Sequence, residues 1–381
     1  MQARRITPLL VAASLVTMLA AQNTARFEPL YREALARREA SFGAEDPRTA
    51  ESLVDLALFL NEQQRPGEAE PFLRRAVSIL QKQESREELA RVVVNLADIR
   101  LAQGEGEDAE TLLRKALALR QEADEAAEVL DRLTSLLRLK GDLEEAEVFS
   151  RRALSFGRTA ERLRGLAVTL EPLGKTGEAA TLHREALALQ EREFGPLHPQ
   201  VALTLNSIAL LTVSGGDFGA AAPLLERALD VFEKTLGPES PEAATALDNL
   251  GNVRRGQRDF PAAESLLRRA LDIRRKTLGE EHPDTALTCN NLAGVYHVQG
   301  KLDEAEPLYR KAIAIREKQL GKNHPDTAQT LYNLGHVLRQ KGDLIAAAQL
   351  FSRALEAAEA SVGPDAPFTN EVRSSLAGVQ R

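Results

Sequence analysis

The chain has 381 residues and a formal net charge of −7, with a single cysteine and 4% aromatic residues. Acidic and basic residues are interleaved along the chain, and no basic stripe is visible. This distribution argues against nucleic-acid binding. One cysteine excludes an intrachain disulfide, and the position of Cys289 on an apolar helix face predicts a small buried residue. The apolar residues are mostly Ala and Leu, a composition that favours helix over sheet.

Residues 1–21 have the pattern of a secretory signal peptide. Arg4 and Arg5 precede an apolar run over 6–19, and Ala20-Ala21 would form a small-residue cleavage site. The run is too short for a comfortable membrane span. We therefore expect an exported protein, periplasmic or secreted. An alternative stays open, in which this segment is an uncleaved helix that anchors the chain to the membrane or packs as the first helix of a repeat.

Small residues recur in register along the rest of the chain, and this recurrence predicts a repeat array. Two series of alanines, seven residues apart, have the same successive spacings of 40, 37, 33, 42, 42, 42 and 42 residues. The first series is Ala69, Ala109, Ala146, Ala179, Ala221, Ala263, Ala305 and Ala347, and the second is Ala76, Ala116, Ala153, Ala186, Ala228, Ala270, Ala312 and Ala354.

Each repeat is predicted to be a pair of helices. In the repeat that begins at Leu278, apolar spacing predicts a first helix over 283–299 and a second over about 303–319, separated by Gly300. The predicted layout is a half-repeat helix at 27–43, a repeat at 44–83, three irregular shorter repeats at 84–193, four regular 42-residue repeats at 194–361, and a C-terminal capping helix at 362–381.

The phrases HPDTA, NNLAGVY and QGKLDEAEPLYRKAIAIREK, together with the 42-residue spacing, resemble the tetratricopeptide repeat, and specifically the kinesin light chain class of it. The resemblance implies an all-α fold, a right-handed α-solenoid of antiparallel helix pairs. It also implies a concave groove, lined by the first helix of each pair, that binds other proteins. It implies no connection with kinesin itself.

The groove residues are predicted from their positions on the first helices, out of phase with the apolar stripe. Asn249, Asn291 and Asn333 recur every 42 residues, and an amide can both donate to and accept from a peptide backbone. In similar repeats this row holds an extended segment of a partner. The alternative is that these amides bond to the adjacent repeat and set the pitch of the superhelix. The full predicted set is Asn206, Asp248, Asn249, Asn252, Arg255, Asn290, Asn291, His297, Tyr332, Asn333, His336 and Arg339.

No catalytic, cofactor or metal site is predicted. His198, His282 and His324 recur at the same connector, once per repeat, which puts them too far apart to share one metal ion and favours a structural role in the turn. His297 and His336 could approach each other on the groove wall, but no carboxylate or cysteine accompanies them. The sequence also lacks a P-loop and the GxSxG and HExxH motifs.

These observations predict a non-enzymatic scaffold that binds a protein or peptide segment along the groove of residues 194–361, with no nucleic-acid partner and no small-molecule substrate. A second hypothesis is a self-assembling structural repeat protein of the cell envelope, in which copies of the array associate with each other.

Overall fold

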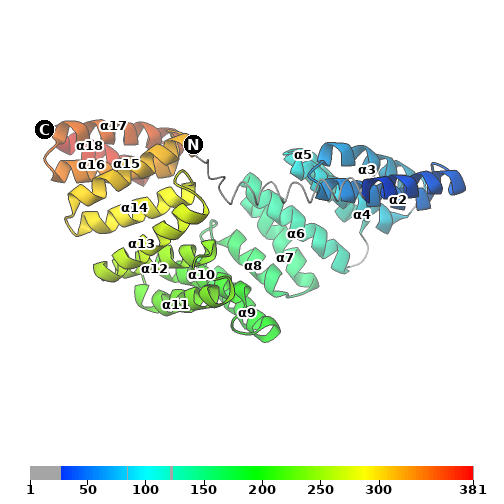
Figure 1. Cartoon of the computed structure of the whole chain (residues 1–381), viewed down its shortest axis with the longest axis horizontal. Helices are drawn as coiled ribbons and strands as arrows, with labels where there is room; N and C mark the ends of the chain where they lie inside the picture. Colours follow the sequence, from blue (N-terminus) through cyan, green and yellow to red (C-terminus); the bar gives the residue numbers. More distant parts are fainter. Residues whose placement is uncertain (1–26, 84, 121–122, 381) are drawn as a thin grey trace, which may run out of the picture. The chain divides into compact units, whose positions relative to one another are not determined.

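The computed structural model describes residues 27–83, 85–120 and 123–380, and these residues form helices joined by short turns (Figure 1). The predicted signal peptide, residues 1–21, lies outside the described residues. Within the described part of the chain, no helix has the length and apolar character needed to cross a membrane. The chain divides into two compact units, Met1–Leu182 and His183–Arg381, and the dividing point falls inside helix α9, before the boundary at 193/194 predicted from the repeat spacing.

The first unit begins with a helix over residues 27–42 and continues with helix pairs. Its helices are α2 (Pro47–Glu62), α3 (Pro66–Gln81), α4 (Arg86–Ala102), α5 (Gly106–Leu119), α6 (Ala123–Lys140), α7 (Leu143–Phe156) and α8 (Ala160–Leu170), followed by α9 (Thr176–Phe194). Helix α8 is short, and it lies between Ala146 and Ala179, the two alanines with the shortest spacing of 33 residues. The irregular repeats therefore keep the helix-pair architecture with shortened helices and turns.

The second unit contains the regular repeats and the C-terminal helix. Its helices are α10 (Pro199–Ser214), α11 (Phe218–Thr235), α12 (Pro241–Gly256), α13 (Phe260–Thr277), α14 (Pro283–Val298), α15 (Leu302–Gln319), α16 (Pro325–Gln340), α17 (Leu344–Ser361) and α18 (Pro367–Val379). Each first helix packs on its own second helix, and each second helix packs on the next repeat, so the pairs form one stack from α10 to α18 (Figure 1). The first helices also contact each other in series, from α10 to α12, α14 and α16.

The ends of the helices follow from local sequence. In the repeat of α14, the connector Gly279 adopts φ +95°, a left-handed conformation that favours glycine and that ends the preceding helix. Pro283 then stands in the first turn of α14, where its missing N–H is not needed. The second helices α11, α13 and α17 begin after an aspartate whose carboxylate accepts a backbone N–H of the first turn, as Asp259 does from the Ala262 N–H.

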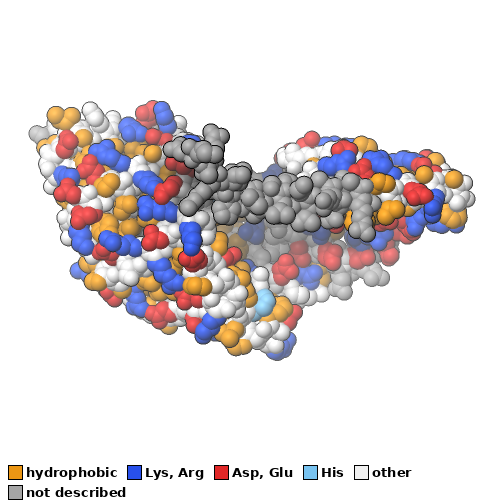
Figure 2. All heavy atoms as spheres, viewed as in Figure 1, with side chains coloured by type: hydrophobic (Ala, Val, Ile, Leu, Met, Phe, Trp, Pro, Cys, Tyr) orange, Lys and Arg blue, Asp and Glu red, His pale blue; other side chains and the backbone are white. Residues whose placement is uncertain are grey.

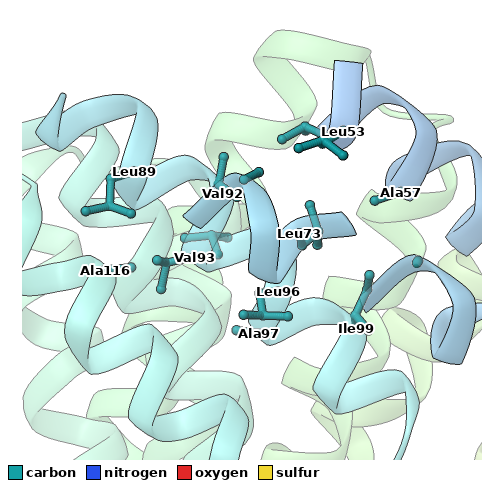
Figure 3. Close-up of a cluster of buried hydrophobic side chains, with 14 of the residues drawn as sticks. Leu53, Ala57, Leu73, Leu89, Val92, Val93, Leu96, Ala97, Ile99 and Ala116 are labelled. Carbon is teal, nitrogen blue, oxygen red and sulfur yellow. The ribbon is translucent and has the colours of Figure 1, made fainter. Parts of the chain in front are cut away.

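The two alanine series lie on the second helices of the pairs, and each of these sixteen alanines is fully buried. Larger apolar residues fill the space between consecutive helices. In the first unit, Leu53, Leu73 and Leu96 from α2, α3 and α4 belong to one buried cluster (Figure 3). Cys289 is fully buried as predicted, and burial raises the pKa of its thiol to about 11.

Candidate functional site

The predicted groove residues lie on four first helices that contact each other in series. Asn206 is on α10, Asp248 to Arg255 are on α12, Asn290 to His297 are on α14, and Tyr332 to Arg339 are on α16. Both the packing of consecutive repeats and the 42-residue register place equivalent residues in a row across these helices. The row is half-buried to exposed at most positions, with three enclosed exceptions described below.

The amides of the row bond to one another between repeats. Asn249 Nδ2 donates to Asn206 Oδ1 at 2.8 Å, and Asn333 Nδ2 donates to Asn290 Oδ1 at 3.4 Å. Asn291 Nδ2 donates to the Asp248 carboxylate at 2.8 Å. Each of these bonds joins a first helix to the first helix of the preceding repeat. Bonds of this kind are what the alternative hypothesis predicted, in which the amides bond to the adjacent repeat and set the pitch of the superhelix. Contact of the same amides with a partner remains a prediction, since each amide has further hydrogen-bonding capacity.

Three residues predicted to line the groove are enclosed between repeats. Asp248 is 2% exposed and Asn291 is 8% exposed, and they bond to each other. Tyr332 is 7% exposed, and its hydroxyl donates to Glu371 Oε1 of α18 at 2.9 Å, while its ring contacts that of Phe351. The close approach of neighbouring first helices covers these side chains, so their role is to hold consecutive repeats together.

A buried ion pair behind the row escaped the sequence analysis. Arg274, in the last turn of α13, is 3% exposed and donates through Nη1 to Thr288 Oγ1 at 2.6 Å and to the Asp284 carbonyl at 3.0 Å. Its Nη1 also lies 3.5 Å from Asp248 Oδ1. Burial raises the pKa of the Asp248 carboxyl, and the Arg274 guanidinium and the Asn291 amide oppose that rise. This cluster ties α12, α13 and α14 together.

The next repeat builds the same cluster without a carboxylate. Arg316, 42 residues after Arg274, is 4% exposed and donates to Thr330 Oγ1 and, at 2.8 Å, to the Asp326 carbonyl. Asn290 replaces the aspartate, and among the residues that the structure describes no carboxylate oxygen lies within 4.0 Å of Arg316. Burial lowers the pKa of the Arg316 guanidinium. The sequence signal that could have revealed both clusters is an arginine followed by threonine at a separation of 14 residues, repeated with the 42-residue period.

Two arginines, Arg255 and Arg339, stand among the accessible amides of the row. Arg255 lies across Gly294, where an added Cβ would be only 2.6 Å from Arg255 Nη1, so this glycine makes room for the arginine. Arg339 is exposed at the same end of α16. Among the residues that the structure describes, no carboxylate oxygen lies within 4.0 Å of the guanidinium of Arg255 or of Arg339. His297 and His336 belong to the same row, and burial lowers the pKa of both imidazoles.

The first unit carries charged links where the second carries amides. Arg132 Nε of α6 donates to Asp98 Oδ1 of α4 at 3.3 Å, and Arg162 Nε of α8 donates to Asp131 Oδ2 of α6 at 3.0 Å. Consecutive first helices are thus bonded to each other in both units, by ion pairs in the irregular repeats and mainly by amides in the regular ones.

The connector histidines have the structural role that was predicted for them. The Nδ1 atoms of His198, His282 and His324 accept the backbone N–H two residues later, at 3.2, 3.1 and 3.2 Å. Each histidine is therefore the N-cap of a first helix. Among the described residues, no group of three or more His, Cys, Asp or Glu is arranged to hold a metal ion.

The Tetratricopeptide repeat family matches residues 17–82, 88–159, 158–234, 215–276, 242–297 and 284–360, which together cover most of the chain. The chain belongs to the tetratricopeptide repeat family. The predicted fold class, an all-α solenoid of antiparallel helix pairs, is confirmed. A comparison with curated proteins finds no match.

Several solved structures resemble this chain. A tetratricopeptide repeat protein from Parabacteroides merdae is 17% identical with a TM-score of 0.56, covering 77% of this chain and 99% of that one. The apo form of RapI is 17% identical with a TM-score of 0.59, covering 71% and 98%. The putative kinesin light chain repeats of Podosopora anserina are 25% identical with a TM-score of 0.44, covering 52% and 93%. Tetratricopeptide repeat proteins generally act as protein-interaction scaffolds and are typically not enzymes.

Proposed function

We propose that this chain is a non-enzymatic scaffold that binds an extended segment of a partner protein along the row of first helices α10, α12, α14 and α16. The observation that carries this proposal is the composition of the row. Half-buried amides with unused hydrogen-bonding capacity, such as Asn249 and Asn333, share the row with cations that have no described carboxylate partner. Amides suit a peptide backbone whatever its side chains, and the cations favour a segment with acidic residues.

The charges elsewhere in this unit support this proposal by contrast. On the second helices and the connectors, basic residues pair with nearby acids, many of them in the preceding repeat, as Arg269 does with Glu233 at 2.6 Å. The face of the molecule in Figure 2 accordingly shows Lys and Arg interspersed with Asp and Glu. Arg255 and Arg339 depart from this pairing in a chain whose net charge is negative.

The test uses the full chain to capture partners from its native host, with mass spectrometry and hydrogen exchange on the captured complex. We expect slower exchange in α12, α14 and α16, and at least a tenfold loss of capture when Arg255 and Arg339 are both changed to Gln. The matched control changes Arg227 and Arg353 to Gln, two exposed arginines of second helices. Capture that both double variants retain equally, or protection confined to second helices, would contradict the proposal. The self-assembly hypothesis instead requires a mass in light scattering that grows with concentration.

We further propose that the chain is exported with removal of residues 1–21, because that segment has the charge and apolar pattern of a signal peptide. Intact mass of the protein recovered from its host decides this. A mass that still includes residues 1–21 would contradict cleavage and leave the membrane-anchor alternative.

A further inference from the structure

A cavity opens in the second unit where α11 and α13 begin and where α12 and α14 end. Its volume is about 580 Å³, which is large enough for an aromatic ring and its substituents. It is lined by Phe218, Asn252, Arg255, Gly256, Arg258, Phe260 and Val298. Two of these, Asn252 and Arg255, also belong to the predicted groove.

The lining of the cavity includes two arginines. Arg255 lies across Gly294, and Arg258 follows in the turn after α12. Among the described residues, no carboxylate oxygen lies within 4.0 Å of either guanidinium, and neither guanidinium has a hydrogen-bond acceptor. Their neighbour Arg254 shows the contrast, because it pairs with Glu226 and donates to a nearby glutamine at 2.9 Å. Two arginines without a bonded carboxylate therefore line one cavity.

Three other residues of the lining are apolar. Phe218 and Phe260 are the first residues of α11 and α13, and Val298 ends α14 with 61% of its surface exposed. A Cβ at Gly256 would lie 2.5 Å from the ring of Phe218, so this glycine lets the ring lie close against α12. A ligand that fills the cavity would cover this apolar surface and meet the two arginines.

The backbone of Arg258 adds a second observation. Arg258 has φ +64°, whereas the equivalent positions of the other regular repeats are glycines with positive φ: Gly216, Gly300 and Gly342. A left-handed conformation is unfavourable for a residue with a Cβ. Gln64 occupies the same turn in the first full repeat with φ 60°, so the fold tolerates such a residue. What distinguishes Arg258 is that this turn places a second arginine in the lining of the cavity that also includes Arg255.

We propose that this cavity binds an aromatic dianion, with the ring between Phe218, Phe260 and Val298 and the two negative charges at Arg255 and Arg258. Two guanidiniums match a dianion in charge and supply N–H donors for its oxygens, and the apolar side chains of the lining match a ring. The dianion can be an aryl phosphate or an aromatic dicarboxylate. This site goes beyond the proposed scaffold function, since it needs no protein partner in the groove.

The experiment is calorimetric titration of the full chain at neutral pH with phenyl phosphate and with phthalate, which are the two kinds of aromatic dianion. Benzoate supplies the ring with one charge, and inorganic phosphate supplies the charge without the ring. We expect saturable binding of at least one aromatic dianion and at least tenfold weaker binding of both benzoate and inorganic phosphate. The tighter binder of the two, phenyl phosphate or phthalate, shows whether the site prefers an aryl phosphate or an aromatic dicarboxylate. Equal binding of benzoate, or no saturable binding of either dianion, overturns the proposal.

The decisive variant is Arg258→Gly, which removes one cation and restores the residue found in the other regular repeats. We expect at least a tenfold loss of dianion binding with a melting temperature that is unchanged or raised by about 2 °C. Arg255→Gln should give a similar loss, and Arg310→Ala, which removes an exposed arginine from α15, should leave binding unchanged. Unchanged binding in Arg258→Gly, or an equal loss in Arg310→Ala, would show that the cavity does not recognise the dianion. If Arg258→Gly lowers the melting temperature, Arg255→Gln alone decides between recognition and a structural role.

Discussion

The buried pair of Asp248 and Arg274 gives the sharpest prediction about stability. Asp248→Ala removes the only described carboxylate within 4.0 Å of a guanidinium that is 3% exposed. It also takes the acceptor away from Asn291 Nδ2, which now donates to Asp248 at 2.8 Å. Removing one partner of a buried pair typically costs about 3–5 kcal/mol.

The structure places the expected cost at the lower end of that range. The 3.5 Å separation is long for a charge-assisted hydrogen bond, and Arg274 keeps its bonds to Thr288 and to the Asp284 carbonyl. We therefore expect Asp248→Ala to lower the free energy of unfolding by roughly 3–4 kcal/mol. Asp248→Asn should cost less, about 1–2 kcal/mol, because it keeps an acceptor for Asn291 and reproduces the amide that stands at the equivalent position of the next repeat.

Urea unfolding followed by far-ultraviolet circular dichroism measures both values, and the exposed Asp272→Ala on α13 is the control, expected within about 0.5 kcal/mol of the parent chain. Equal costs for Asp248→Ala and Asp248→Asn would refute the reasoning, since the charge alone would then decide stability. A cost of Asp248→Ala below about 1 kcal/mol would refute it in the other direction, by showing that Arg274 needs no counter-ion.

Two further predictions concern packing and pH. Ala305→Glu places a carboxylate at a fully buried helix contact, and it should lower the free energy of unfolding in urea by several kcal/mol. Ala314→Glu, at an exposed position of the same helix, should lower it by less than about 0.5 kcal/mol. Equal costs would contradict the assigned register. Burial lowers the pKa of His297 and His336 below 6.5, so the unfolded chain binds more protons than the folded chain as the pH falls below 6.5. Their stabilising contribution is therefore complete above pH 6.5 and is lost as the pH falls through the lowered pKa values. Calorimetric melting at a series of pH values below 6.5 should show this loss of stability. Changing both histidines to Asn should reduce the slope of stability against pH, and an unchanged slope would contradict the assignment to these histidines.

The repeat architecture could be predicted because it depends on residues close together in sequence. The burial of Ala305 and Ala312 follows from their spacing on one helix, and the ends of α14 follow from His282, Pro283 and Gly300. These features need only helix geometry and the conformational preferences of single residues. The same local rules hold in the irregular repeats, where the fold also forms despite shorter periods.

The burial of the predicted groove residues could not be predicted from one helix. Asp248 and Tyr332 share the helical phase expected of groove residues, but they are enclosed because neighbouring first helices approach closely at those positions. How closely they approach depends on the superhelix, which is the product of contacts between residues of different repeats. Arg274 and Arg316 are the reverse case. Near the C-terminal end of a second helix an arginine normally suggests a solvated side chain, yet both reach between helices to a threonine in the next repeat.

Differences between equivalent residues of the regular repeats carry more functional information than the residues that the repeats share. Shared residues, such as the alanines and the connector glycines, are explained by a fold that every repeat must build. Asp248 against Asn290 and Arg258 against Gly300 are not explained in that way, because the same helix pair forms with either residue. At Arg258 the departure is also unfavourable for the backbone, so stability gives no reason for it. Arg258 lies in a left-handed turn and lines the same cavity as a second arginine and three apolar side chains. It is therefore the position in this unit where ligand binding is the simplest explanation of the sequence.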